Sequence, residues 1–211
     1  MRMILRFVYI GLAAAALWVF LPVEARAIDG PHAGFGTGGQ TCNGCHVPHA
    51  ASEGTILLWN RAYSTKDFSW SDATATSSGT TLPTNIKTWS GTTRNCLSCH
   101  DGTLTDKPFG AQISTGDLKG NHPVAVPYPF GGKANKYNGA TTYGLTAGAA
   151  VSGWVASPAN VKIYSDPVET APNNRGIECA SCHDPHDKAT FTKYLRDSLT
   201  ASAICNNCHS K

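Results

Sequence analysis

All eight cysteines of this 211-residue chain lie in four copies of one motif, Cys-x-x-Cys-His. The copies are CNGCH from Cys42, CLSCH from Cys96, CASCH from Cys179 and CNNCH from Cys205. A single pair of this kind is compatible with zinc, a redox dithiol or a covalent haem. Structural disulfides rarely join residues three apart, because one turn places the thiols poorly for an S–S bond. Zinc needs four protein ligands, but it does not require a histidine after every second cysteine.

Four complete motifs with no cysteine left over predict four c-type haems. In that chemistry the two thiols of a motif bind the porphyrin covalently, and the histidine ligates the iron. We expect covalent attachment at Cys42, Cys45, Cys96, Cys99, Cys179, Cys182, Cys205 and Cys208. We expect proximal iron ligation by His46, His100, His183 and His209.

Four further histidines lie outside the motifs: His32, His49, His122 and His186. Their number equals the number of sixth ligands that four haems need. Methionine is the usual alternative axial ligand, but the only methionines, Met1 and Met3, lie in a segment that we expect to be removed. We therefore predict these four histidines as distal ligands. Low haem potentials follow, because two imidazoles stabilise ferric iron better than a thioether does.

The first and third motifs continue to a second histidine, as CNGCHVPH and CASCHDPH. His46 and His49 are too close along the backbone to reach opposite faces of one porphyrin. We therefore expect His49 and His186 each to ligate a haem attached at another motif, which holds neighbouring haems close together. The pairing that we predict joins His49 to the haem of His100, and His186 to the haem of His209.

Residues 1–27 are typical of a secretory signal. Arg2 and Arg6 precede an apolar run from Val8 to Leu21, and Ala25-Arg26-Ala27 is a small-x-small cleavage site. The run is shorter than the ~20 residues that span a bilayer, so we favour cleavage over a retained anchor. We expect an exported mature chain, residues 28–211, without a membrane span. Its net charge is close to zero, which argues against nucleic-acid binding.

The mature chain divides into a haem pair at 28–125, a haem-free insert at about 126–164 and a haem pair at 165–211. HVPHAASEGTILLWN and HDPHDKATFTKYLRD place Leu58 and Leu195 at equal offsets from their motif histidines, which indicates a repeat. Ser71–Thr81 has the composition of a loop. HPVAVPYP should be extended, because its prolines disfavour helix, and should present His122 as a ligand arm.

The fold class that we expect is a multihaem cytochrome c, mostly coil with short helices and few short strands, organised around a chain of four haems. Short helices should lie near 193–204. So few residues for each haem should not build a conventional core. We expect the haems to replace it, with tryptophans packed on the porphyrins: Trp59, Trp70, Trp89 and Trp154.

The paired motifs, together with NHPVAV from Asn121 and GIECASCHDPH from Gly176, resemble the doubled-motif multihaem cytochromes of metal-reducing bacteria. Four haems on a chain of this size resemble their filament-forming branch, the OmcE-type cytochrome nanowires. The resemblance implies electron conduction along a secreted or cell-surface filament, a head-to-tail homopolymer. It also implies redox partners such as periplasmic or outer-membrane cytochromes and external acceptors, and an axial histidine donated between subunits.

Two other functions stay open: a soluble periplasmic tetrahaem shuttle, and a multihaem reductase with one open haem site. A reductase needs an iron with a vacant coordination position. Four intact motifs and a matching number of histidines argue against an enzyme. Small tetrahaem shuttles are typically more densely loaded and more strongly charged than this chain, which favours the filament.

The segment IDGPHAGFGTGG places His32 five residues from the expected new amino terminus. Such a segment is ordered only when something ties it down. The fourth motif lies at the other end, with His209 two residues before Lys211. We predict that His32 ligates a haem of the adjacent subunit in a head-to-tail assembly. The alternative is that His32 folds back onto the haem of its own His46.

Overall fold

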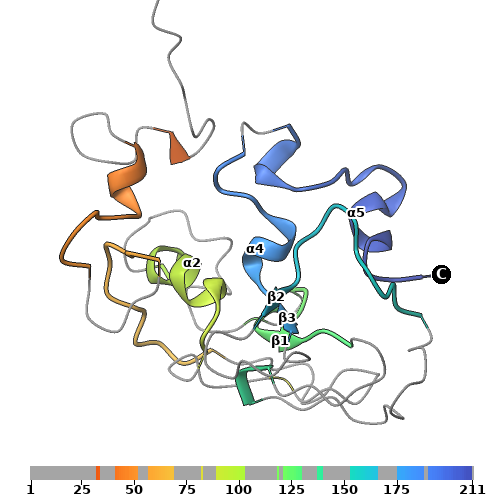
Figure 1. Ribbon diagram of the computed structural model, residues 1–211, viewed down its shortest axis with the longest axis horizontal. Coiled ribbons are helices and arrows are strands. Elements are labelled where there is room, and N and C mark those ends of the chain that lie inside the picture. The colour runs from red at the N-terminus through yellow and green to blue at the C-terminus, as the bar shows by residue number, and fades with distance from the viewer. Residues whose placement is uncertain are drawn as a thin grey trace, which may run out of the picture.

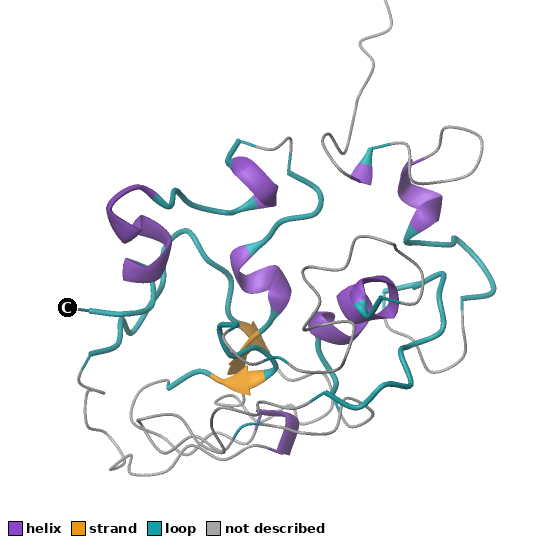
Figure 2. Cartoon of the chain, turned by 180° about the vertical axis from the view of Figure 1, so that it is seen from behind, coloured by secondary structure: helices purple, strands orange, loops and turns teal. Residues whose placement is uncertain are grey.

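Loops dominate the described parts of this computed structural model, and short helices and a small sheet interrupt them (Figures 1 and 2). The structure describes residues 32–33, 41–51, 57–68, 82, 89–102, 118, 121–129, 137–139, 153–165, 175–187 and 190–210. The prediction of mostly coil with short helices and few strands is confirmed for these residues. The expected signal at 1–27 and loop at 71–81 lie outside them.

Each Cys-x-x-Cys-His motif forms a short helical segment or the end of one. These segments are η3 (Thr41–Gly44), α2 (Thr92–His100), α4 (Cys179–Cys182) and α5 (Ala203–Asn206). Three further 3₁₀ turns are η5 (Tyr137–Gly139), η6 (Thr192–Tyr194) and η7 (Thr200–Ser202). The last two confirm short helices near 193–204. None of the helices in the described part of the chain is long and apolar enough to cross a membrane.

The sheet joins the predicted insert to the second haem pair. Its strands are β1 (Val126–Pro127), β2 (Tyr164–Ser165) and β3 (Arg175–Ile177), in the antiparallel order β1-β3-β2. Gly176 lies opposite both Pro127 and Tyr164. A proline is tolerated here because β1 is an edge strand. The sheet lies at the centre of the molecule, below α4 and beside α2 in Figure 1, and α2 packs against α4.

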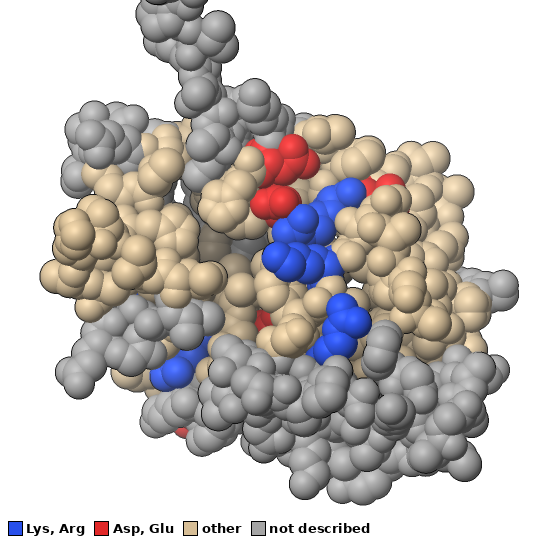
Figure 3. Space-filling model, viewed as in Figure 1, with Lys and Arg blue, Asp and Glu red and all other residues tan. Residues whose placement is uncertain are grey.

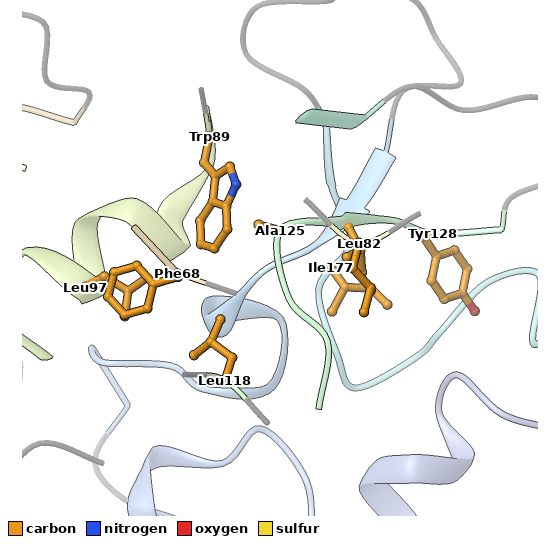
Figure 4. Close-up of a cluster of buried hydrophobic side chains, with 9 residues drawn as sticks. Phe68, Leu82, Trp89, Leu97, Leu118, Ala125, Tyr128 and Ile177 are labelled. Atoms are coloured by element: carbon orange, nitrogen blue, oxygen red, sulfur yellow. The ribbon is translucent and has the colours of Figure 1, made fainter. Parts of the chain in front are cut away.

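A small hydrophobic core surrounds this sheet, so the expectation that haems would replace a conventional core is wrong. Its nine buried side chains are Phe68, Leu82, Trp89, Leu97, Leu118, Ala125, Val126, Tyr128 and Ile177 (Figure 4). They come from α2, from the strands and from loops far apart in sequence. Such scattered contributions leave no periodic pattern. A second cluster, of Val161, Leu195 and Ile204, packs against Cys182 and Cys208.

The tryptophans divide between the core and the motifs. Trp89 is 1% exposed and packs near Phe68, with ring centroids 6.4 Å apart, so it is a core residue. Trp59 and Trp154 instead lie beside the motif histidines His46 and His209, with ring centroids 5.6 and 4.5 Å away. Those two remain candidates for porphyrin packing. Trp70 lies outside the described residues.

The segment HPVAVPYP contains no helix, as its prolines predict. Val126 and Pro127 form β1, and Ala125 adopts a positive φ of 57° immediately before it. This turn at a fully buried alanine was not expected from the sequence. His122, at the start of the segment, is exposed.

Gly176 offers a test of how tightly the sheet is packed. A methyl group at this position would overlap the ring of Tyr137, which is fully buried. We expect Gly176→Ala to lower the free energy of unfolding by about 1–3 kcal/mol, the usual cost of overpacking. Guanidinium unfolding of the purified protein, followed by far-ultraviolet circular dichroism, measures this change.

The matched control is the same substitution in a Tyr137→Ala background. Because the ring is then gone, Gly176→Ala should cost clearly less there, and the two substitutions should be non-additive. An equal cost in both backgrounds would show that the ring of Tyr137 is not what limits this position.

Candidate haem-attachment sites

The first and third motifs are built in the same way around their histidines. His46 forms an isolated antiparallel bridge with Trp59, and His183 forms one with Leu195. The Nδ1 atom of His46 lies 2.8 Å from the carbonyl oxygen of Leu57. The Nδ1 atom of His183 lies 2.8 Å from the carbonyl oxygen of Lys193.

These Nδ1 contacts prepare both rings for ligation. A carbonyl oxygen only accepts hydrogen bonds, so Nδ1 must carry the proton in each contact. Nε2 is then the atom with a free lone pair, and the hydrogen bond fixes the direction in which it points. Metal-ligating histidines commonly donate their other ring nitrogen to a carbonyl in this way.

Backbone hydrogen bonds fix the register of the repeat. Val47 donates to Leu58 and Asn60 donates to Cys45, both at 2.9 Å. In the second copy, Asp184 donates to Tyr194 at 2.7 Å and Arg196 donates to Cys182 at 2.9 Å.

The repeat is therefore real, but its predicted alignment is off by one residue. Trp59, and not Leu58, corresponds to Leu195, because the first connecting loop is one residue longer. Burial agrees with this correction, since Leu58 is 54% exposed and Leu195 only 8%. The two residues before each bridge partner adopt positive φ in both copies: Leu57, Leu58, Lys193 and Tyr194.

A side chain ties each connecting loop back to its motif. In the first copy, Nδ2 of Asn60 donates to the carbonyl of Asn43 at 2.7 Å. In the second, Nε of Arg196 donates to the carbonyl of Ala180 at 2.9 Å. Arg196 also forms an ion pair with Asp184 at 2.8 Å. In Figure 3, acidic and basic side chains adjoin in the middle of the face shown, between largely uncharged regions.

The second motif holds its histidine differently. His100 is the last residue of α2. Burial, and then the neighbouring His32 and His183, lower the pKa of His100 to about 4. It is therefore neutral at physiological pH, which is the form that binds metal. In the fourth motif, His209 forms an isolated bridge with Trp154, as His46 and His183 do with their own partners.

Histidine rings from distant parts of the chain lie close together in pairs, with different tilts between their planes. The ring centroids of His46 and His186 are 6.1 Å apart, with their planes within 21°. The rings of His32 and His100 are 5.9 Å apart. Those of His122 and His209 are 6.3 Å apart. Each pair joins one motif histidine to one histidine outside the motifs.

This spacing fits one iron between each pair. A metal–imidazole bond is about 2 Å long, so two rings on opposite sides of one metal ion have centroids roughly 6 Å apart. All three observed separations agree with that value. The site residues therefore fit the haem that the motifs imply.

The structure changes the predicted pairing of distal histidines. His186 lies beside His46 and not beside His209, whose neighbour is His122. His100, whose haem is predicted above to be ligated by His49, has His32 as its neighbour. Local sequence could not reveal these pairs, because the partners are far apart along the chain.

His32 is held within its own chain. Its backbone N–H donates to the hydroxyl of Tyr194 at 2.8 Å. Its ring stacks on the Tyr194 ring, with centroids 5.1 Å apart and planes within 8°. Burial lowers the pKa of His32. Within this single chain His32 lies beside His100 and not beside His46, and its predicted ligation of a haem in an adjacent subunit stays a prediction. Tyr194 is a residue of this site that the sequence reasoning missed, and no motif marks it.

The cysteines show that consecutive motifs are neighbours in space. Burial and then the nearby Cys99 thiol raise the pKa of Cys45. Cys96 and Cys179 share a thiol–thiol hydrogen bond, which raises the pKa of Cys96. Burial and then Cys208 raise the pKa of Cys182 to about 11. In a loaded protein these sulfurs would be the thioether atoms, so adjacent attachment points lie close together.

The comparisons with known proteins agree with this chemistry. Residues 171–211 match the family described as the doubled CXXCH motif. No curated protein matches the chain. Among the described residues, no group of three or more His, Cys, Asp or Glu side chains forms a metal site by itself. The motifs and the family match support a c-type cytochrome, a protein that binds haem c covalently and transfers electrons.

Proposed function

We propose that the chain carries four haems, one at each motif, and that two histidines hold every iron. Three ring pairs at 5.9–6.3 Å support three of the four irons and are the observation that carries the proposal. His49 and His183 are the two remaining histidines, and we assign them to the fourth iron. The two motif extensions then exchange ligands: His186 serves the haem at His46, and His49 serves the haem at His183.

Electron transfer between closely spaced centres is the function that this arrangement supports best. Bound haem would supply a ferric–ferrous couple at each motif. The chain's own residues hold the imidazoles in position and keep the attachment points of consecutive motifs together. Ligation by two histidines gives low potentials and leaves no position for a substrate, so we propose a carrier and not an enzyme.

We further propose an extracellular, electron-conducting filament as the assembled form. This proposal rests on the resemblance of the paired motifs to filament-forming cytochromes. Exposed Leu57, Leu58 and Leu199, at 54–64% exposure, are apolar side chains that a subunit contact would cover. We now propose that His32 ligates the haem of His100 in its own chain, so a filament joint would need contacts other than a shared iron.

A soluble periplasmic shuttle is the second candidate, and one observation favours it. The three ring pairs lie within a single chain, so a monomer can supply its own axial ligands. Electron microscopy and sedimentation of the secreted material separate the two candidates. Filaments support the conducting polymer, and a uniform monomer supports the shuttle.

Carbon monoxide tests whether every iron is closed. With two histidines on each haem, the reduced native protein has no vacant position for this ligand. We expect its visible spectrum to change very little when carbon monoxide is added. Acid-unfolded protein is the positive control, since its haems lose their distal histidines. Stoichiometric binding to the native protein would mean an open haem and would revive the reductase.

The ligand exchange between motif extensions makes a sharper prediction. In a Cys42→Ala/Cys45→Ala protein, which lacks the first haem, His186 has no iron to serve. Adding His186→Ala should therefore create no high-spin haem in the electron paramagnetic resonance spectrum. His49→Ala is the matched variant and should create one, because it removes a ligand from the haem of His183.

The opposite outcomes are equally clear. A new high-spin signal from His186→Ala in that background would mean that His186 serves another haem, such as that of His209. No signal from His49→Ala would remove His49 from the ligand set.

A further inference from the structure

The second and third motif helices cap each other. Thr93 is the second residue of α2, and its backbone N–H has no partner within the helix. The carboxylate of Glu178, which immediately precedes α4, accepts this hydrogen bond at 2.7 Å. In return, the hydroxyl of Thr93 accepts a hydrogen bond from the N–H of Cys179, the first residue of α4, at 3.0 Å.

This reciprocal cap, formed by Glu178 and Thr93, is completely buried, and both residues are 0% exposed. The hydroxyl of Tyr137 donates to the second carboxylate oxygen of Glu178 at 2.6 Å. Ser181 completes a capping box with Glu178 inside α4. Hydrogen bonds at a dry site with charged or polar partners are costly to break, because the groups left behind have no water.

Close packing allows the carboxylate to reach α2. A methyl group at Gly91, the residue that precedes α2, would overlap the carboxylate of Glu178. A side chain at this position would therefore displace the carboxylate of Glu178 from α2. The glycine is used here for the approach of a side chain, and its φ of −95° is ordinary.

The reciprocal cap lies directly at two attachment points. Cys179 is itself one of the hydrogen-bonding residues, since its backbone N–H donates to Thr93 of α2. The first cysteine of the third motif is thus held directly against the helix that carries the second motif. Electron transfer rates fall exponentially with the distance between centres, so a shift of either helix would change the rate between their haems.

We propose that the reciprocal cap of Glu178 and Thr93 is a positioning device that fixes the separation of the second and third attachment helices, and with it the coupling between their two haems. This proposal rests on the proposed function in one respect, since the second and third motifs must both carry haem. Both residues act through the backbone of α2 and α4, because each accepts a hydrogen bond from a backbone N–H of the other helix.

Adjacent threonines supply the matched variants. Thr93→Val removes the hydroxyl that accepts from Cys179 and keeps the size of the side chain. Thr93→Ser restores the hydroxyl. Thr92→Val is the control, because the hydroxyl of Thr92 is buried with no hydrogen-bond partner among the described residues. Each variant is prepared as the full haem-loaded chain.

Two measurements separate this inference from the proposed function. Mass spectrometry counts the haems of each protein, and fewer than four in the unsubstituted protein would overturn the proposed function. Soret circular dichroism then reports the coupling between neighbouring haems. Coupled haems give a pair of Soret bands of opposite sign, the couplet. We expect this couplet to weaken in Thr93→Val, to recover in Thr93→Ser and to be unchanged in Thr92→Val.

An unchanged couplet in a fully loaded Thr93→Val protein would overturn the proposal, as would an equal loss in Thr92→Val. Glu178→Met is the second variant, for use if Thr93→Val does not fold. It keeps the approximate length of the side chain, but it removes the acceptor of the Thr93 N–H. Loss of the couplet supports the reciprocal cap, and an unchanged couplet in this fully loaded variant also overturns it.

Discussion

The short gap between paired imidazole rings is the constraint on which the rest of this structure depends. Metal–nitrogen bonds are about 2 Å long and tolerate little error, so two histidines from distant segments must meet within a narrow range of separations. His46 and His183 are held by Nδ1 contacts to carbonyl oxygens and by isolated bridges to neighbouring loops, and His209 by a bridge of the same kind. Loops must then bring the histidines outside the motifs close to them.

The sheet, the packed helices and the loop contacts together hold these histidines in position. The sheet joins the central insert to the start of the second haem pair, and α2 packs on α4. Tyr194, which lies one residue before the bridge partner of His183, also holds His32 in place by a hydrogen bond and a ring stack. One loop thereby positions a motif histidine and a distant histidine together. The buried cluster around Trp89 keeps these segments from moving independently.

The sequence predicted the features that depend on short, regular spacings between residues. The motifs, the loop-rich fold and the repeat at His46 and His183 all depend on neighbouring residues. Long-range features were missed or wrong: the alignment of the repeat, the pairing of His186, the neighbour of His32 within the chain and the presence of a core. Each depends on tertiary contacts between segments without periodicity. Glu178 precedes its motif as one acidic residue among several, and only burial and its contact with Thr93 distinguish it.

The most direct test of the account is the identity of the two histidines on each iron, read from an electron-density or cryo-EM map of the haem-loaded protein. The account predicts one iron between His46 and His186, with further irons between His32 and His100 and between His122 and His209. The fourth should lie between His49 and His183. An iron bound by both His46 and His49, or by His186 and His209, would contradict it.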